Sequence, residues 1–168
     1  MKISGNINLP GDKSISHRAL MFASLTDGEC IINNISTGED VETTRKCLGQ
    51  CGILSQKLGN KVQITGGAFS TPGLPLDCGN SGTSIRLLAG LLSGKGITAE
   101  FIGDTSLSKR PMNRIIEPLN EMGVEIGSNN GYLPLTIKPN MLKGLSFSPS
   151  IASAQVKSCI MLAGLGGE

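Results

Sequence analysis

Two cations and two hydroxyl groups lie in one short stretch near the start of the chain, residues 9–18 (LPGDKSISHR). Its proline and glycine interrupt an extended segment, and a helix-like apolar pattern follows directly. Lys13, Ser14, Ser16 and Arg18 therefore stand at the start of a predicted helix, where backbone N–H groups lack intrahelical partners. That end of a helix carries partial positive charge, and an arginine fork fits a phosphate. The stretch predicts a phosphate or carboxylate site. The alternative is a serine that only caps the helix, flanked by solvated cations.

His17 is the only histidine of the chain and stands between the two cations. Neighbouring positive charge disfavours protonation of an imidazole, so we expect His17 to be neutral. We expect it to act as a spacer or hydrogen-bond donor rather than as an acid or base. No carboxylate in the sequence has an evident partner for proton transfer.

A second helix start with ligand-binding character is predicted at residues 79–86 (GNSGTSIR). Its glycines, Gly82 among them, let a ligand approach the backbone closely, while Asn80 and Thr83 supply hydrogen bonds and Arg86 supplies charge. The stretch lacks the lysine of a P-loop, so a nucleotide is not indicated. The alternative is a glycine-rich turn in which Thr83 is an ordinary helix cap.

Two further stretches have the same character. Residues 104–111 (DTSLSKRP) place Lys109 and Arg110 just before a predicted helix, where their charges oppose the helix dipole. An anionic ligand would relieve that cost, whereas the alternative is a solvated basic loop. Residues 150–157 (SIASAQVK) begin another helix with Ser153 and Gln155. Gln155 would be poorly placed on that apolar face unless another group hydrogen-bonds it.

The elements that position these residues follow from periodicity and from glycine, proline and capping signals. The first part of the chain predicts a half-buried strand 2–9, a helix 14–25, a strand 29–35, a helix capped by Asp40 and ended by Gly52, and strands 53–58 and 61–65. The second part predicts a helix with the apolar run 86–92, a strand 97–102, a helix from Pro111 to Gly123 kinked at Pro118, and strands 124–127 and 132–138.

The order of these elements repeats along the chain. Arg18 and Arg86 are 68 positions apart, and Gly52 and Gly123 are 71 apart, as are Arg86 and Lys157. Self-similarity at such a period indicates copies of one supersecondary unit. The sequence predicts two complete βαβαββ units, followed by the first strand and helix of a third unit that is truncated.

The amino-acid composition limits the classes to which this protein can belong. The 168 residues are 39% apolar and 17% charged with a mean hydropathy near zero, which is typical of a globular chain. A net charge of +2 and only 3% aromatic residues argue against nucleic-acid binding. We expect no membrane span, because no apolar run is long enough, and no signal peptide.

The five cysteines are scattered without a C-x-x-C pair, which argues against zinc and against a disulfide framework. Cys47 and Cys51 fit one buried face of a helix. We expect no metal, and a reducing, cytoplasmic setting.

Four motifs together strongly resemble the 5-enolpyruvylshikimate-3-phosphate synthase family, in order and along the whole chain. They are KSISHRAL at residues 13–20, GNSGT at 79–83, KRPM at 109–112 and SAQ at 153–155. The resemblance implies an α/β fold of repeated βαβαββ units, the inside-out α/β barrel of enolpyruvyl transferases. It also implies enolpyruvyl transfer from phosphoenolpyruvate to the 5-hydroxyl of shikimate-3-phosphate, with release of phosphate and without metal or cofactor. The family belongs to aromatic amino-acid biosynthesis and is the target of glyphosate.

The resemblance also implies roles for single residues. Lys13 is similar to the catalytic lysine that touches both substrates. Shikimate-3-phosphate would contact Lys13, Ser14, Arg18, Ser153 and Gln155, and phosphoenolpyruvate would contact Lys13, Asn80, Gly82, Arg110 and Gln155. Thr83, Arg86 and Lys109 would support these contacts.

By the same resemblance, residues 1–11 form a strand of the family's other domain. Residues 12–76, 77–140 and 141–168 are then successive units of a partial domain, the last incomplete. The chain resembles about two-fifths of a member, its N-terminal portion, and the proton-transfer carboxylates belong to the remainder. We therefore expect weak binding and no turnover from this chain alone. Two alternatives stay open: a UDP-N-acetylglucosamine enolpyruvyl transferase, and an inactive fragment or half of a split enzyme that only captures phosphorylated ligands.

Overall fold

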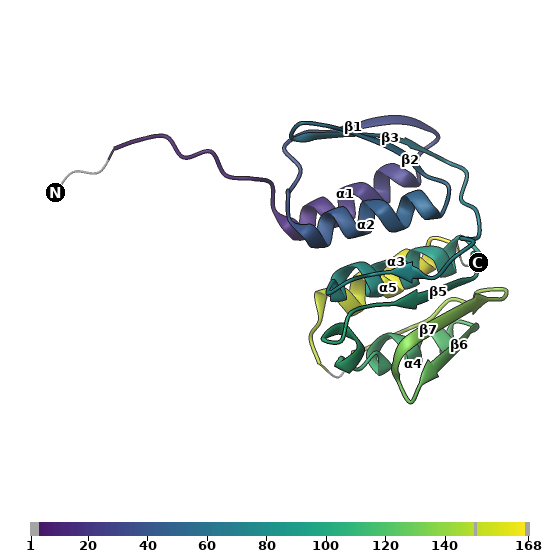
Figure 1. The fold of residues 1–168 in the computed structure, drawn as a ribbon. Coiled ribbons are helices and arrows are strands. Elements are labelled where there is room, and N and C mark those ends of the chain that lie inside the picture. The colour runs from purple at the N-terminus through teal and green to yellow at the C-terminus, as the bar shows by residue number, and fades with distance from the viewer. Residues whose placement is uncertain (1–3, 150, 167–168) are drawn as a thin grey trace.

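The computed structural model describes residues 4–149 and 151–166, which lie in two stacked halves (Figure 1). The upper half consists of α1 (Lys13–Ser24), β1 (Gly28–Ile32), α2 (Glu39–Gln50), β2 (Leu54–Leu58) and β3 (Lys61–Gly66). The lower half consists of β4 (Leu76–Asp77), α3 (Gly82–Gly94), β5 (Ala99–Ile102), the 3-10 turn η1 (Leu107–Lys109), α4 (Asn113–Glu121), β6 (Val124–Asn129), β7 (Tyr132–Pro139) and α5 (Ala154–Gly164).

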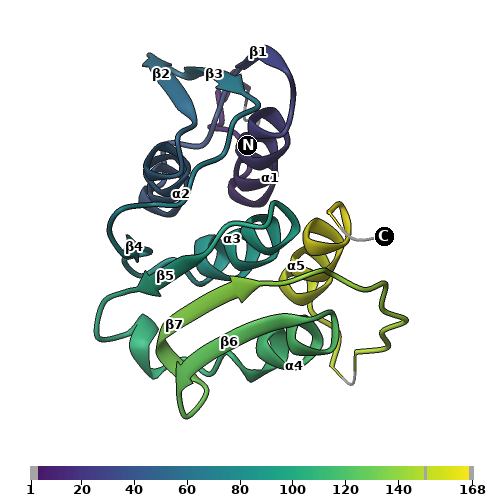
Figure 2. The same cartoon turned by 90° about the vertical axis from the view of Figure 1, so that its right-hand side faces the viewer.

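Two sheets lie on the outside, and α1, α2, α3 and α5 lie between them (Figures 1 and 2). The upper sheet has the order β1-β3-β2 and is antiparallel throughout. The lower sheet has the order β4-β5-β7-β6, in which β4 runs parallel to β5 and the other pairs are antiparallel. Helices inside and sheets outside agree with the α/β fold class that the sequence predicts.

Helices α1, α2, α3 and α5 start at the same end of the structure (Figure 1). Lys13 of α1 contacts Asp40 of α2, and one turn further along both helices His17 contacts Thr44, so α1 and α2 run parallel. Helices α3 and α5 also run parallel and approach closely at two glycines. A Cβ on Gly90 would lie 2.1 Å from the carbonyl oxygen of Cys159, and one on Gly94 would lie 2.7 Å from that of Leu162. These two glycines let the backbones pack directly.

The interior is one continuous apolar cluster that spans both halves. Leu20, Leu48 and Ile64 fill it in the upper half, and Leu88, Phe101 and Leu135 fill it in the lower half. Cys47 and Cys51 are buried on one face of α2, as their spacing predicts. Burial raises the pKa of the Cys51 and Cys159 thiols to about 12, so neither is a reactive nucleophile.

Most predicted elements are confirmed to within a few residues, but two predicted strands are wrong. Residues 4–9 form no strand, and Ile7 and Leu9 are exposed, because no neighbouring strand in this structure supplies ladder hydrogen bonds. Residues 1–3 lie outside the described part. The third unit also lacks its predicted first strand, since residues 141–149 are irregular.

Two predicted helix starts are also corrected. Gly38, rather than Asp40, is the N-cap of α2, and Asp40 lies inside the first turn, where an acidic side chain is favourable. Helix α4 begins at Asn113 instead of Pro111, because the carbonyl of Pro111 accepts a hydrogen bond from Arg86 and the amide of Met112 donates to Gly131. Pro118 lies within α4, as predicted. Among the described residues, no helix is both long and apolar enough to cross a membrane.

Candidate functional site

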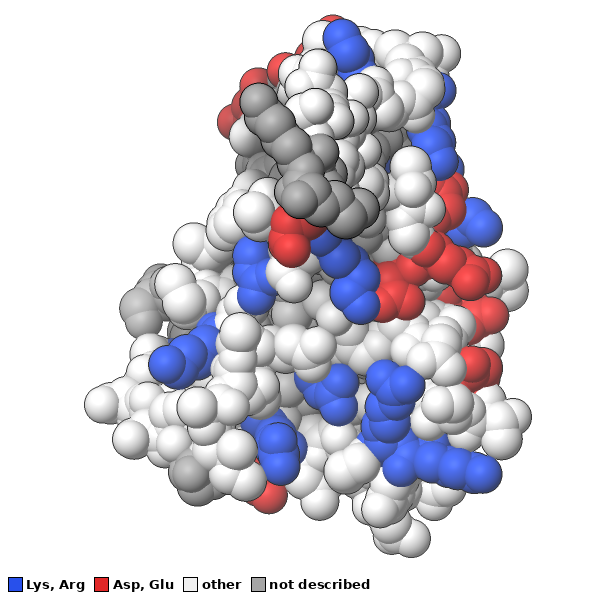
Figure 3. Space-filling view, turned by 90° about the vertical axis from the view of Figure 1, so that its left-hand side faces the viewer, with Lys and Arg blue, Asp and Glu red and all other residues white. Residues whose placement is uncertain are grey.

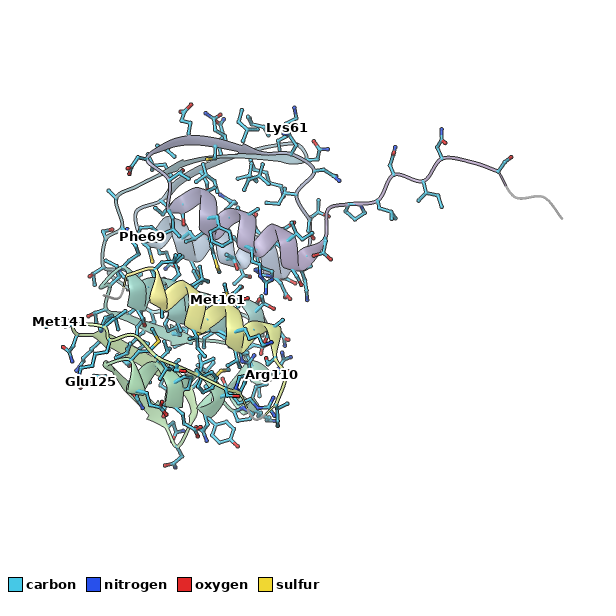
Figure 4. All side chains as sticks on the ribbon, turned by 180° about the vertical axis from the view of Figure 1, so that it is seen from behind. Lys61, Phe69, Arg110, Glu125, Met141 and Met161 are labelled. Carbon is cyan, nitrogen blue, oxygen red and sulfur yellow. The ribbon has the colours of Figure 1, made fainter. Side chains whose placement is uncertain are left out.

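The face at which α1, α2, α3 and α5 begin carries a concentration of lysine and arginine side chains (Figure 3). Arg110 lies toward this end of the molecule, whereas Phe69 and Met141 lie at the opposite end (Figure 4). Because each helix start adds partial positive charge to the lysines and arginines, this face suits an anion.

Arg86 and Gln155 connect the starts of α3 and α5. The guanidinium of Arg86 donates to Gln155 Oε1 at 3.2 Å, to the carbonyl of Gly82 at 3.1 Å and to that of Pro111 at 3.3 Å. Gln155 Nε2 in turn donates to Thr83 Oγ1 at 3.0 Å. The hydrogen bonds that the sequence requires of Gln155 are therefore present, and they come from residues 69 and 72 positions away.

Asn80 holds a second cation beside this group. Its side-chain oxygen accepts from Arg110 at 2.8 Å, while its Nδ2 donates to Asp104 Oδ2 at 2.8 Å. The backbone N–H of Leu107 and then the Asn80 amide lower the pKa of Asp104, which stays ionised. Asp104 therefore fixes Asn80, and Asn80 fixes the guanidinium of Arg110.

Gly82 allows the two guanidinium groups to converge. A Cβ on Gly82 would lie 2.6 Å from one nitrogen of Arg86 and 3.3 Å from one of Arg110. Burial, followed by the nearby charges of Arg110 and Arg114, lowers the pKa of Arg86. An arginine nevertheless remains charged at neutral pH, so the cluster holds mutually repelling cations that an anion would relieve.

On α1, Lys13 and Arg18 also have specific partners. Lys13 Nζ lies 2.9 Å from Asp40 Oδ2, and this pair is partly exposed. Arg18 donates to the carbonyl of Ser14 at 2.9 Å and to Ser158 Oγ of α5 at 2.7 Å. The two cations thus link α1 to α2 and to α5.

Side chains at the starts of α1, α2 and α3 meet in the interior between the two halves. His17 Nδ1 lies 2.7 Å from Thr44 Oγ1, which lies 2.7 Å from Ser84 Oγ. Burial, more than Lys13 or Arg18, lowers the pKa of His17 to about 4. The expected neutral histidine is confirmed, with burial as its largest cause.

The structure brings most of the predicted site residues to this face. Asn80, Gly82, Thr83, Arg86, Arg110 and Gln155 form one hydrogen-bonded group, and Lys13 and Arg18 border it on α1.

Three predicted residues have fewer contacts with the other site residues, and the helix caps differ from those that the alternative interpretations named. Ser14 is exposed, Lys109 is exposed at the end of η1, and Ser153 uses its hydroxyl to cap α5. Asp12, not a serine, caps α1, and Ser81, not Thr83, caps α3.

Sequence reasoning missed Asp40, Asp104, Thr44, Ser84 and Ser158 as partners of these groups. The one available signal was the position of Asp40, since an acidic residue early in one helix can meet a lysine early in a parallel neighbour. The other pairings depend on contacts between distant segments.

The arrangement can bind and orient anions. Cations, amides and hydroxyls converge on this face, and the carboxylates of Asp40 and Asp104 accept from Lys13 and from Asn80. Among the described residues, no three His, Cys, Asp or Glu side chains lie close enough to share a metal ion.

The whole chain, residues 1–168, matches the family described as EPSP synthase (3-phosphoshikimate 1-carboxyvinyltransferase). It is 48% identical to the 3-phosphoshikimate 1-carboxyvinyltransferase of Ruthia magnifica subsp. Calyptogena magnifica, over 97% of this chain and 38% of that protein. It is 47% identical to the enzyme of the same name from Leuconostoc citreum, over 99% of this chain and 40% of the relative.

A solved structure of EPSP synthase from Acinetobacter baumannii superposes with a TM-score of 0.92 at 40% identity. That match covers 98% of this chain and 38% of the solved one. The chain therefore spans about two-fifths of the length of the proteins that it matches.

Proposed function

The chain belongs to the EPSP synthase family, and we propose that it supplies one side of the site for enolpyruvyl transfer from phosphoenolpyruvate to shikimate-3-phosphate. The observation that carries this proposal is the convergence of Arg86, Arg110 and Gln155 at the starts of two parallel helices. Both substrates are multiply anionic, and such a face binds anions.

In this proposal, Lys13 is the catalytic residue and contacts both substrates. Ser14, Arg18, Ser153 and Gln155 bind shikimate-3-phosphate. Asn80, Gly82, Arg110 and Gln155 bind phosphoenolpyruvate, and Thr83, Arg86 and Lys109 support them. Each assignment combines the motif resemblance with a position at or beside this face.

The proposed chemistry of these residues is electrostatic. The fixed guanidinium groups of Arg86 and Arg110, together with the Lys13 ammonium, stabilise negative charge on the reacting carboxylate and phosphate groups. The hydrogen bonds that hold the two guanidinium groups are already formed in this structure, so these groups need little reorganisation on binding. Proton transfer comes from residues outside this chain, and the reaction uses no metal or cofactor.

We further propose that the remainder of a full-length protein completes this site. Relatives are about two and a half times as long, and this chain carries a groove of about 270 Å³ between α1 and α5. Phe22 and Met161, which line the groove, are 54% and 73% exposed. Residues 1–11 would join a second domain, residues 12–76 and 77–140 would be successive units, and residues 141–168 would begin a third. We place the assembled enzyme in the cytoplasm.

Calorimetric titration of the chain with phosphoenolpyruvate, shikimate-3-phosphate and their mixture tests binding. We expect measurable affinity for both ligands, and a loss of about tenfold or more for phosphoenolpyruvate in Arg110→Ala, because a charge-assisted contact is worth about 1.5–3 kcal/mol. Lys95→Ala is the matched control, since Lys95 caps the opposite end of α3. Equal losses in the two variants would overturn the assignment.

Addition of the remaining portion of a close relative tests activity. Phosphate release from the two substrates is expected only from the mixture of both polypeptides. Binding without any restored release would favour a module that only captures phosphorylated ligands. Binding of UDP-N-acetylglucosamine in preference to shikimate-3-phosphate would favour the sister transferase.

A further inference from the structure

A row of buried polar side chains joins the starts of α1, α2 and α3. His17 and Thr44 lie 2.7 Å apart, Thr44 and Ser84 lie 2.7 Å apart, and Ser84 and Ser81 lie 2.7 Å apart, measured between side-chain donor and acceptor atoms. His17, Thr44 and Ser84 have no exposed surface, and Ser81, which is also the N-cap of α3, is 1% exposed. The row therefore crosses the boundary between the two halves in a region that water does not reach.

The number of donors and acceptors in the row determines which group donates each hydrogen bond. Ser84 Oγ also lies 3.1 Å from the carbonyl oxygen of Asp40, which can only accept. A single hydroxyl proton cannot serve both that carbonyl and Ser81. All the hydroxyl groups are satisfied when Ser84 donates to Asp40, Ser81 and Thr44 donate to Ser84, and His17 Nδ1–H donates to Thr44.

The other histidine tautomer is less favourable. It would place the proton on Nε2, which is buried and has no hydrogen-bond partner among the described residues. A buried N–H without an acceptor is costly, so the proton belongs on Nδ1. Thr44 thus accepts from α1 and donates to α3 through one hydroxyl, which valine, of the same shape, cannot do.

We propose that Thr44 is a positioning residue that holds the anion-binding groups of α1 at a fixed separation from those of α3. On α1, Lys13 lies one turn before His17, the residue that contacts Thr44. On α3, Thr83 directly precedes Ser84 and accepts a hydrogen bond from Gln155. A small shift of α1 against α3 would separate Lys13 from the Asn80–Arg86 group. In the proposed function, the two ligands contact the groups of α1 and those of α3 together. A fixed spacing between these groups therefore lowers the entropic cost of binding. This proposal rests on the proposed function.

Thr44→Val and Thr44→Ser test the hydroxyl, and Ser93→Ala is the control because Ser93 is buried in α3 and its hydroxyl has no hydrogen-bond partner in the described structure. Phosphoenolpyruvate affinity is expected to fall about tenfold in Thr44→Val, to stay within about twofold in Thr44→Ser and to be unchanged in Ser93→Ala. In parallel, nitrogen NMR of the single imidazole should show protonated Nδ1 in the unaltered chain and in Thr44→Ser. The ring-nitrogen signals should shift in Thr44→Val.

The two readouts separate positioning from simple packing. If the His17 signals change in Thr44→Val while the affinity does not, or if neither changes, the proposal is overturned. If circular dichroism shows that Thr44→Val does not fold, Ser84→Ala replaces it, with the same expected loss of affinity and the same outcomes.

Failure of the proposed function gives a different pattern. If the unaltered chain does not bind phosphoenolpyruvate, the coupling of the helix starts is tested by hydrogen exchange of the Ser16 and Ile85 amides. These amides donate backbone hydrogen bonds in the first turns of α1 and α3. Faster exchange of both in Thr44→Val, but not in Thr44→Ser, supports the coupling of the two helix starts. Unchanged exchange in Thr44→Val overturns it.

Discussion

The upper and lower halves repeat the same order of helices and strands, yet within residues 4–149 and 151–166 only the lower half contains a strand before its first helix. In the lower half that strand is β4, which pairs in parallel with β5 and leads directly to Asn80. In the upper half the corresponding residues, 4–9, are exposed and unpaired. Residues 4–9 are therefore not held by a sheet in this structure, whereas the strand that leads to Asn80 is.

The same contrast extends to the packing and to the binding groups. On the upper sheet, Ile31 and Leu54 are 63% and 71% exposed. Helix α3 of the lower half is buried at almost every position, and its Arg86 has partners on three sides. The preorganised binding groups are therefore concentrated in the lower half, and we expect the larger share of the stability there too, because the outer face of the upper sheet leaves large apolar side chains exposed.

The largest expected effect is on stability, and a matched pair of core truncations measures it. Leu88 of α3 and Leu48 of α2 are both buried leucines in helices. We expect Leu88→Ala to lower the free energy of unfolding by about 4–5 kcal/mol and Leu48→Ala by about 2–3 kcal/mol. Both side chains are fully buried, but α2 buries only four of its twelve residues, against eleven of thirteen in α3, so α2 can move into the cavity more easily. Urea unfolding measures both, and Leu54→Ala, on the exposed face, should stay within about 0.5 kcal/mol. Equal losses of unfolding free energy at Leu88 and Leu48 would contradict the expected difference in stability between the two halves.

The next largest effect concerns the boundary between the halves, where His17 lies. A buried histidine with a pKa of about 4 in the folded state binds fewer protons than the unfolded chain does between pH 6.5 and 4. The contribution of neutral His17 to the free energy of unfolding is therefore fully present above pH 6.5. It falls as the pH is lowered, and the loss is on the order of 3 kcal/mol at pH 4. Urea unfolding at several pH values measures this loss.

His17→Gln supplies the control for that pH dependence, because the chain contains no other histidine. The variant should be less stable at pH 7 but should lose little further stability between pH 6.5 and 5. A variant that shows the same slope as the unaltered chain would assign the pH dependence to other groups.

Arg86→Lys tests whether the lower-half binding groups are preorganised. Lysine keeps the charge but lacks the planar fork that reaches Gln155 and the carbonyls of Gly82 and Pro111. We expect phosphoenolpyruvate affinity to fall about 10- to 100-fold by calorimetry. Arg45→Lys is the matched control, since Arg45 pairs with Glu42 and Ser55, neither of which belongs to the proposed binding groups. A loss of affinity below about twofold in Arg86→Lys would mean that the positive charge alone, without the planar fork, is enough for phosphoenolpyruvate binding.

Local sequence signals predicted the helices and their ligand-binding starts. Proline, glycine and capping residues act over a few positions, so the helices that begin near Lys13, Gly82 and Ala154 could be read from the chain. The repeat then indicated that similar helix starts serve similar roles. The need of Gln155 for a hydrogen-bond partner was also visible, because burial of an amide is costly in any fold.

Contacts between distant segments explain what the sequence did not predict. The strand predicted at residues 2–9 has the right alternation, but a strand also needs a neighbour, which alternation does not reveal. The pairing of Thr44 with Ser84 joins residues 40 positions apart on different helices. Likewise Asp40 resembled a helix cap, and only the parallel packing of α1 and α2 shows that it meets Lys13.

The smallest expected effect is at the ion pair between Lys13 and Asp40, in the upper half. Their side chains are 55% and 30% exposed, so Asp40→Asn should change the free energy of unfolding by less than about 1 kcal/mol. It should also raise phosphoenolpyruvate affinity about two- to threefold, because the ligand no longer competes with a carboxylate for Lys13. Glu125→Gln, at a partly exposed pair on the lower sheet, is the control and should leave affinity unchanged. If Asp40→Asn instead weakened binding as much as Arg86→Lys, the binding groups of the upper half would be as firmly positioned as those of the lower half, and the contrast between the halves would not extend to the site.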